Sequence, residues 1–327
     1  MKLATLPNGT PDGALVVVSR DLRQALYAAS VAPTLQAAIE NWALVSPALH
    51  ALYDQLNSGR AESAFAFDAR HAMAPLPRAY QWCDGSAFLN HGTLMQKAFN
   101  LPPIEGAERI PLMYQGAGDD FRGPHEDIQL PSQAHGMDFE GEFAVLVDEV
   151  ALGTSAQAAG AHIRLVLQLN DVSLRALAPR EMITGFGFVQ AKPSSSFAPV
   201  AVTPDELGAA WRDGRVHLPL QVQRNGEWFG HPNGGEMNFG FDQLIAHAAL
   251  TRRLGAGTLL GSGTVSNADR AAGSACIAER RAIEMIEQGA PRTAFMAYGE
   301  RVRMEALGLD GQPMFGAIDQ RYMPANR

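Results

Sequence analysis

The segment Met137-Asp-Phe-Glu-Gly-Glu-Phe-Ala-Val-Leu-Val147 combines three carboxylates with a run of apolar residues. Side chains alternate along a strand, so Asp138, Glu140 and Glu142 are expected to share one face and the apolar residues the other. Same-face neighbours lie ~6.6–7 Å apart along the backbone, so two glutamates at this spacing can bring their oxygens onto one cation. The alternative interpretation is a half-buried strand whose acidic face is solvated.

A second acidic segment follows another apolar strand pattern. Arg164-Leu-Val-Leu-Gln-Leu169 has the pattern of a buried strand and continues into Asn170-Asp-Val-Ser-Leu-Arg175. Functional groups are common at the ends of strands, although Asp171 can equally cap a following turn. Two glutamates and one aspartate would form an all-oxygen site, which suits Mg²⁺, Mn²⁺ or Ca²⁺ rather than zinc or copper.

The chain is predicted to contain an N-terminal module, residues 1–75, and a main domain, residues 76–327. In the module, Lys2–Leu6 and Ala14–Ser19 are candidate strands around a turn-rich segment. The proline-containing segment Met73–Arg78 is expected to be a linker between the two parts.

One helix is predicted in the module and one in the main domain. The first is Ala48–Asn57, with Ser46 as N-cap and Pro47 at the first helical position. The second has apolar residues at helical spacing, from Phe241 to Ala248. Short apolar runs elsewhere predict an α+β fold in which strands dominate the second part. These runs are Phe143–Val147, Ile163–Leu169 and Val216–Gln223.

Composition excludes several classes of partner. The chain has 327 residues, 46% of them hydrophobic and 18% charged, and a formal net charge of −8, which disfavours binding to nucleic acid. No signal-peptide pattern and no apolar stretch of about 18 residues is present, so we expect a cytoplasmic protein that does not enter a membrane. Cys83 and Cys276 are expected to be free thiols.

Four motifs occur in order: Asp138-Phe-Glu-Gly-Glu142, Asn170-Asp-Val-Ser-Leu-Arg175, Lys192-Pro-Ser-Ser-Ser196 and Gly261-Ser-Gly-Thr-Val-Ser266. Together they resemble the fumarylacetoacetate hydrolase family over roughly residues 80–305, and the N-terminal module resembles it loosely. The resemblance implies an α+β catalytic domain built as a mixed β-sheet roll or barrel, a small N-terminal α/β module, and a homodimer.

The resemblance also implies a metal site and a catalytic pair. The family's metal ligands correspond to Asp84, Glu140, Glu142 and Asp171, and Mg²⁺ is the expected ion, with Mn²⁺ or Ca²⁺ as alternatives. Fumarylacetoacetases add a histidine seven residues after the first aspartate, as in Asp84-Gly-Ser-Ala-Phe-Leu-Asn-His91. The glutamate that completes their dyad corresponds to Glu279, after a loop one residue longer than expected.

Further positions correspond to residues that bind or position the substrate. Arg175 and Lys192 resemble the family's positioning arginine and lysine, and Tyr114 and Thr264 resemble substrate contacts. Three other positions depart from the fumarylacetoacetase pattern. Asn100, Ala178 and Met182 stand where an arginine, a glutamine and a tyrosine that read the substrate's carboxylate ends are expected.

The function implied is hydrolysis of a carbon–carbon bond in a β-diketo acid such as fumarylacetoacetate, giving two acids in the breakdown of aromatic compounds such as tyrosine. His91 would act as the base that activates water, Glu279 would orient it, and Lys192 and Arg175 would stabilise the oxyanion. Within the family, the alternatives are an acylpyruvate hydrolase, or an isomerase, tautomerase or decarboxylase. A scaffold or small-acid binding protein without turnover is the non-enzymatic alternative.

Other chemically suggestive residues are interpreted as structural. His125 is assigned to a polar surface loop, His247 to a helix and Glu181 to a solvated position. The Gly255–Gly261 segment follows a helix and lacks the spacing of a nucleotide-binding loop. Ser262 and Ser266 lack the G-x-S-x-G context of a serine hydrolase nucleophile.

Overall fold

The computed structural model describes residues 1–325, and its largest feature is an 11-stranded mixed sheet. The strand order is β4-β3-β2-β1-β13-β10-β9-β18-β5-β6, with β12 paired to β10. In that order the strands are Phe65–Ala66, Gln24–Tyr27, Ala14–Val18, Lys2–Leu6, Ala201–Val202, Ile163–Asn170, Gly141–Val147, Thr258–Gly261, Trp82–Gly85, Met113–Gly116 and, for β12, Ser196–Phe197. Across residues 1–325 this path stays open, so the predicted α+β class is confirmed without a closed barrel.

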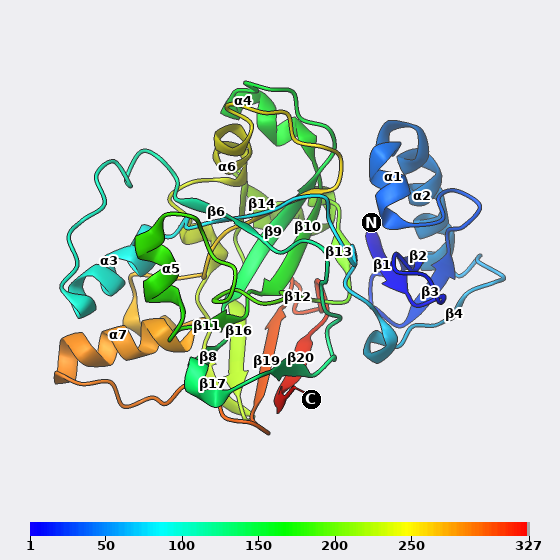
Figure 1. Ribbon diagram of the computed structural model, residues 1–327. Coiled ribbons are helices and arrows are strands. Elements are labelled where there is room, and N and C mark those ends of the chain that lie inside the picture. The colour runs from blue at the N-terminus through cyan, green and yellow to red at the C-terminus, as the bar shows by residue number, and fades with distance from the viewer. Residues whose placement is uncertain (326–327) are drawn as a thin grey trace.

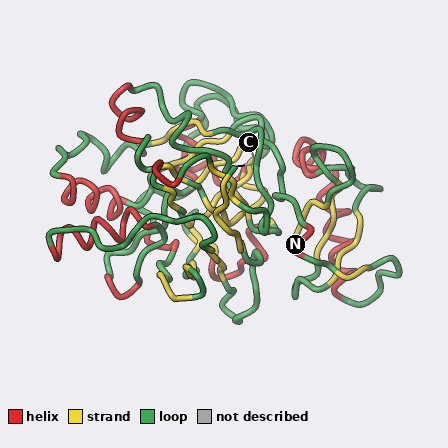
Figure 2. Tube along the Cα trace, turned by 60° about the horizontal axis from the view of Figure 1, so that its bottom comes forward, coloured by secondary structure: helices red, strands yellow, loops and turns green. Residues whose placement is uncertain are grey.

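A second sheet packs beside the first and has the order β17-β16-β19-β20-β7. Its strands are Glu227–Gly230, Leu220–Arg224, Arg301–Ala306, Ile318–Pro324 and Ile128–Leu130. Two short ladders pair β8 (Met137–Asp138) with β11 (Ser173–Leu174) and β14 (Trp211–Arg212) with β15 (Arg215–Val216). Strands run through the middle of the molecule with helices outside them (Figure 2).

The helices form three groups, two at the ends of the molecule and one, α4 with α6, at the top of the view in Figure 1. Helices α1 and α2 cover the N-terminal strands at one end, and α3, α5 and α7 lie at the other. The α-helices are α1 (Leu35–Glu40), α2 (Trp42–Asn57), α3 (Leu89–Phe99), α4 (Ala156–Ala159), α5 (Ala178–Thr184), α6 (Phe241–Ala248) and α7 (Ile277–Gln288).

Strand β9 is the centre of the core. All seven of its residues are buried, because β10 and β18 flank it and apolar clusters cover both of its faces. Phe143 and Val145 belong to one cluster, and Ala144 and Leu146 belong to the other. A strand buried on both faces explains the uninterrupted apolar run at this point of the sequence.

The strand order brings three distant carboxylates to one level of the sheet. Asp171 directly follows β10, and Glu142 on the neighbouring β9 lies opposite Leu169. Strand β18 lies between β9 and β5, and its Gly261 pairs with Asp84 on β5. Sheet register therefore places Asp84, Glu142 and Asp171 close together although the first and the last are 87 positions apart in the sequence.

The acidic segment differs from the predicted continuous strand. It divides into β8 and β9, because Glu140 leaves the sheet and makes an isolated bridge with Cys276. Its face is not solvated: Asp138, Glu140 and Glu142 are exposed by 0%, 5% and 0%. The solvated-face interpretation is therefore wrong, because elements from later in the chain cover the carboxylates.

The N-terminal strands continue the main sheet rather than standing apart from it. Strand β1 pairs with β13 through Lys2 and Leu3, so β1 to β4 extend the sheet beyond β10. The expected linker Met73–Arg78 contains no helix or strand, and Ala74 to Pro77 are buried in it. Thr5 Oγ1 donates a hydrogen bond to the Pro75 carbonyl oxygen at 2.6 Å, which holds this segment against β1.

Two predicted element boundaries are wrong. Helix α2 begins at Trp42, so Pro47 lies inside it and not at its first turn. A proline early in a helix removes one backbone hydrogen bond, a loss that the packing of buried residues such as Leu49 and Tyr53 offsets. The predicted strand Val216–Gln223 is divided between β15 and β16. The predicted helix at Phe241–Ala248 is confirmed as α6.

Both cysteines are buried free thiols, as predicted. Among residues 1–325, no helix combines the length and the apolar character needed to span a bilayer.

The central position of β9 predicts a strong dependence of stability on its aromatic side chain. Phe143 is fully buried and packs against Phe315, with ring centroids 5.9 Å apart. Phe143→Ala should lower the free energy of unfolding by about 3–5 kcal/mol in a denaturant titration, because it leaves a cavity. Phe186→Ala is the matched control: Phe186 is 95% exposed, so its loss should change stability by less than about 0.5 kcal/mol. Equal effects of the two substitutions would contradict this packing.

Candidate metal centre and active site

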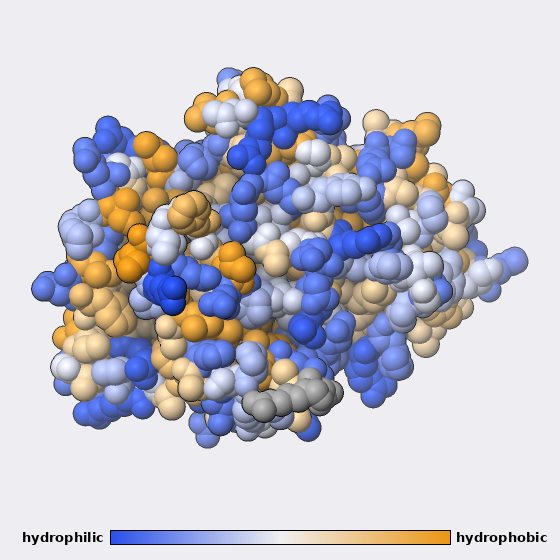
Figure 3. Space-filling model, in the orientation of Figure 1, coloured by the Kyte–Doolittle hydropathy of each residue, from blue (hydrophilic) through white to orange (hydrophobic). Residues whose placement is uncertain are grey.

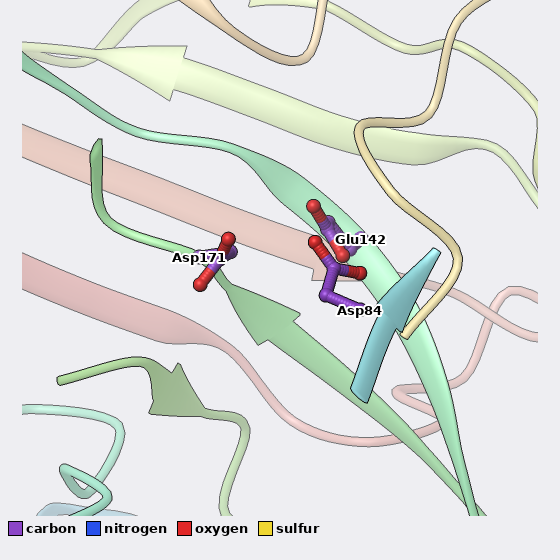
Figure 4. Close-up of side chains that lie close together, drawn as sticks. All are labelled: Asp84, Glu142 and Asp171. Carbon is purple, nitrogen blue, oxygen red and sulfur yellow. The ribbon is translucent and has the colours of Figure 1, made fainter. Parts of the chain in front are cut away.

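Three carboxylates meet where β5 and β10 end and β9 begins. Asp84, Glu142 and Asp171 each offer one oxygen, and these oxygens lie within 4.8 Å of one another. Figure 4 shows the three side chains directed toward a common point, each from a different segment of the chain. All three are buried, with exposed fractions of 4%, 0% and 0%. We call these residues the carboxylate triad.

The carboxylate triad has the properties of a cation site. Neither carboxylate oxygen of the buried Glu142 has a hydrogen-bond partner in residues 1–325. Asp84 Oδ1 accepts a hydrogen bond from the Gly263 N–H at 3.1 Å. A Cβ at Gly261 would lie 2.3 Å from Asp84 Oδ1, so this close approach requires glycine. Buried carboxylates without donors are costly unless a cation binds them, and an all-oxygen set suits Mg²⁺, Mn²⁺ or Ca²⁺.

The electrostatics of the carboxylate triad favour the same conclusion. Burial and the negative charge of Asp171 raise the pKa of Asp84 well above its ordinary value. Burial and the charge of Asp84 likewise raise the pKa of Glu142. Like charges in a dry site disfavour ionisation, and a divalent cation would relieve this repulsion.

Asp171 is the best supported carboxylate of the triad. Its Oδ1 accepts a hydrogen bond from Ser195 Oγ at 2.7 Å, and its Oδ2 accepts one from the Tyr114 hydroxyl at 2.6 Å. The Lys192 ammonium group also donates to Oδ2 and lies over the Tyr114 ring, 5.4 Å from its centroid. These partners set the orientation of the Asp171 side chain toward Asp84 and Glu142.

Glu140 lies beside the carboxylate triad but outside it. Its Oε1 contacts Lys192 Nζ at 2.7 Å and Arg175 at 2.8 Å, and its Oε2 accepts a hydrogen bond from Thr264. Burial alone would raise the pKa of Glu140, but the charges of Arg175 and Lys192 hold it below its ordinary value. Glu140 is therefore ionised and surrounded by donors, whereas Glu142 has no donor in the part of the chain that the structure describes.

His91 and Glu279 are brought together from different helices. His91 Nδ1 lies 2.8 Å from Glu279 Oε2, and the two side chains are 15% and 1% exposed. His91 stands in the first turn of α3 and Glu279 in the first turn of α7, where Cys276 Sγ accepts the Glu279 N–H. The contact at Nδ1 leaves Nε2 as the ring nitrogen that can exchange a proton.

Asp138 connects this pair to the carboxylates. Its oxygens accept hydrogen bonds from the Ile277 and Ala278 N–H groups at 2.8 and 2.9 Å, and from Arg175 Nε at 2.8 Å. Asp138 thus binds the N-terminus of α7, which carries Glu279, and the guanidinium that also contacts Glu140. The sequence showed Asp138 on the acidic face, but the partner that gives it this role is about 140 residues away.

The 261–267 loop makes a second connection between the two groups. Gly263 N–H and Thr264 Oγ1 donate to Asp84 and Glu140 respectively, and Asn90 Nδ2 donates to Ser266 Oγ at 2.8 Å. Asn90 precedes His91 directly. The same loop therefore contacts the carboxylates and the helix that carries the histidine.

Some predicted residues have surroundings that sequence reasoning did not foresee. Arg175 lies between Asp138 and Glu140, and Lys192 between Glu140 and Asp171, so both cations are already paired with carboxylates. Glu181 is partly exposed to solvent, and its carboxylate also accepts the N–H groups of residues 189, 190 and 191. The sequence of this short helix, α5, does not reveal such a loop contact in advance.

The three positions that depart from the fumarylacetoacetase pattern lie at the end of α3 or within α5. Asn100 caps the C-terminus of α3 in a left-handed conformation. Ala178 begins α5, and Met182 lies in the same helix with 60% of its surface exposed.

The carboxylate triad predicts metal binding with a defined pH dependence. Because the pKa values of Asp84 and Glu142 are raised in the folded chain, the native state binds protons there more tightly than the unfolded chain, so metal-free protein should lose stability as pH rises. Metal binding must displace those protons, so Mn²⁺ or Mg²⁺ should raise the melting temperature more at about pH 8 than at about pH 6. Glu142→Gln should abolish this stabilisation, and Glu149→Gln, at a side chain 64% exposed, should retain it. A metal-induced shift that survives Glu142→Gln would contradict the site.

Comparison with known proteins identifies relatives of this chain. It is 30% identical over 169 residues to 2,4-didehydro-3-deoxy-L-rhamnonate hydrolase of Sphingomonas sp. (strain SKA58), an alignment that covers 50% of this chain and 55% of that protein. It is 25% identical over 197 residues to oxaloacetate tautomerase YisK of Bacillus subtilis (strain 168), covering 60% and 62% respectively. The chain thus spans less than two thirds of the length of these curated relatives.

A solved structure and two family descriptions extend the comparison. Maleylpyruvate hydrolase of Sphingobium sp. SYK-6, in complex with manganese(II) and pyruvate, matches with a TM-score of 0.66 and 15% identity over 100% of both chains, which is a likeness of fold. The family described as fumarylacetoacetase N-terminal domain 2 matches residues 1–78. The family described as fumarylacetoacetate (FAA) hydrolase C-terminal matches residues 81–321, most of the chain, and so the protein belongs to the fumarylacetoacetate hydrolase family.

Proposed function

We propose that this enzyme hydrolyses a carbon–carbon bond of a β-diketo acid, such as fumarylacetoacetate or an acylpyruvate, and releases two acids. The divalent cation, with Mg²⁺ as first candidate, would be held by Asp84, Glu142 and Asp171, with Glu140 beside them. The observation that carries the proposal is the 2.8 Å contact between His91 and the buried Glu279. Hydrolysis needs a group that takes a proton from water, and this pair is suited to that task.

The chemistry divides between the cation and the protein. When bound, the divalent cation would polarise the diketone and orient it. His91 Nε2 would accept a proton from water as its oxygen adds to the carbonyl carbon, and Glu279 would stabilise the imidazolium. The bond to the neighbouring carbon then breaks, and that carbon takes its electron pair and the proton held by His91. Lys192 and Arg175 would hold Asp171 and Glu140 in place.

The relatives support a hydrolase, but one of them favours tautomerisation as a second candidate function. By name, the rhamnonate hydrolase and the maleylpyruvate hydrolase are hydrolases, whereas the Bacillus subtilis relative is an oxaloacetate tautomerase. A tautomerase moves a proton between carbon and oxygen and consumes no water. The carboxylate triad would serve either reaction, so the products distinguish the two.

The proposed hydrolysis predicts the products. With Mg²⁺ or Mn²⁺, the enzyme should cleave diketo acids, which is followed by the loss of their ultraviolet absorbance. Chromatography should show two product acids in equal amounts. Glu140→Ala should lower kcat/KM strongly, because Lys192, Arg175 and Thr264 lose their common partner. Enol–keto conversion of oxaloacetate with no cleavage of any diketo acid would favour the tautomerase instead. Equal activity of Glu140→Ala and wild type would reject this account of the site.

The dyad predicts a separate effect on turnover. His91→Ala should lower kcat for hydrolysis by about 10²–10⁴-fold, because a positioned general base contributes about that much. Stabilisation by Mn²⁺ should persist, since His91 is not part of the carboxylate triad. His71→Ala is the control, at a side chain 75% exposed, and should keep wild-type turnover. Unaltered turnover in His91→Ala would exclude the histidine from the reaction.

A further inference from the structure

Glu181 in α5 is a carboxylate that the proposed reaction does not use. Its Oε1 accepts hydrogen bonds from the Val189 and Gln190 N–H groups at 3.1 and 2.8 Å, and its Oε2 accepts one from the Ala191 N–H at 2.9 Å. These backbone hydrogen bonds hold the pKa of Glu181 below its ordinary value, because they favour the charged form. One side chain of α5 therefore binds the three consecutive residues that directly precede Lys192.

Packing contributes little to the position of α5. None of its seven residues is buried. Figure 3 shows polar and apolar side chains intermixed on the side of the molecule where α3 and α5 lie in Figure 1. After the helix, Gly185 and Gly187 have φ angles of +72° and +94°, and no other atom lies within 4 Å of where a Cβ would be at either. In a segment with few packed side chains, polar contacts such as those of Glu181 decide the conformation.

The turn that follows α5 leads directly into the site. Ala191 is held on both sides, because its carbonyl oxygen also accepts an N–H group of β11 at 2.8 Å. Lys192 comes next, with a side chain that is 11% exposed, and its ammonium group donates to Glu140 Oε1 at 2.7 Å and to Asp171 Oδ2. The backbone at Ala191 sets where the Lys192 side chain begins, and so it sets which oxygens the ammonium group can reach.

A second contact of the same turn also leads to Asp171. Phe188 packs edge-to-face on Tyr114, with ring centroids 5.1 Å apart, and the Tyr114 hydroxyl donates to Asp171 Oδ2 at 2.6 Å. The two donors to this oxygen, Tyr114 and Lys192, therefore both depend on residues 188–191. A displacement of about 1 Å in such groups is enough to lower the rate of an enzyme strongly.

We propose, resting on the proposed function for its effect on turnover, that Glu181 is a positioning residue, which holds the 189–191 turn so that Lys192 reaches Glu140 and Asp171. Its carboxylate oxygens are occupied by backbone N–H groups, so it acts on the reaction through Lys192. Glutamine at this position could keep the two hydrogen bonds to Oε1. Its amide nitrogen would then face the third N–H of the turn, donor against donor.

Acetylation of lysines tests this contact without relying on turnover. The chain has three lysines, Lys2, Lys97 and Lys192, of which Lys97 is exposed and Lys2 is buried in another part of the molecule. With an N-hydroxysuccinimide ester of acetic acid, peptide mass spectrometry should find Lys192 protected relative to Lys97 in the wild-type protein. Glu181→Ala should raise the rate at Lys192 by at least about tenfold and leave Lys2 protected, because only the turn is released. Glu181→Gln should raise it less.

Turnover should follow the same order. With Mn²⁺ and a diketo acid, kcat/KM should fall by at least about tenfold in Glu181→Ala, and by less in Glu181→Gln. Arg180→Ala is the matched control, because it removes the neighbouring charge of α5 at an exposed position. This variant should keep both the protection of Lys192 and the wild-type kcat/KM.

The contrary outcomes separate this inference from the proposed function. Protection of Lys192 in both Glu181 variants would overturn the inference, whatever reaction the enzyme performs. Labelling of Lys2 together with Lys192 would show a general loosening of the fold, which also overturns it. Labelling of Lys192 with unchanged kcat/KM would remove Glu181 from the reaction. Wild-type protein that cleaves no diketo acid would reject the proposed function, and the labelling would still decide whether Glu181 positions Lys192.

Discussion

The structure depends on one constraint: several carboxylates are buried together at the centre of a sheet. Asp84, Glu142 and Asp171 converge, and Glu142 has no hydrogen-bond donor in residues 1–325. In a dry interior such a group is stable only when protons or a cation offset the repulsion. The elements around these carboxylates supply hydrogen-bond donors, cations and covering apolar side chains.

Two sets of contacts stabilise the carboxylates around the triad: those of the cations with Glu140 and those of Asp138. Lys192 and Arg175 neutralise Glu140, and Lys192 also contacts Asp171, which leaves Glu142 as the carboxylate of the triad without a donor in residues 1–325. Asp138 then binds both Arg175 and the N-terminus of α7, where an anion is favoured by the free N–H groups. Through this arrangement the cation site and the His91–Glu279 pair share one rigid support. A cation site and a pair that can accept a proton are the two parts that the proposed hydrolysis would use.

The family relationship and the geometry answer different questions. Membership in the fumarylacetoacetate hydrolase family places the chain among enzymes that include hydrolases and a tautomerase, all acting on small acids by name. The exposed side chains of α5 and the turn after it lie next to the site, to which Phe188 is joined by its packing on Tyr114. The character of those side chains is apolar, in contrast to the charged interior that they adjoin.

The sequence by itself determined the α+β class, the long strands β1, β2, β9 and β10 and the helix at Phe241–Ala248, because apolar periodicity reports directly on local geometry. It also named the carboxylates, since acidic residues within an apolar strand stand out. It failed at Pro47, where tertiary packing overrides a local helix signal, and at the interrupted strand near Glu140. Only the tertiary structure decided which carboxylates face one another, which ones Lys192 and Arg175 neutralise, and that Asp138 supports α7. Those outcomes depend on the register of strands far apart in the chain, and no local pattern encodes that register.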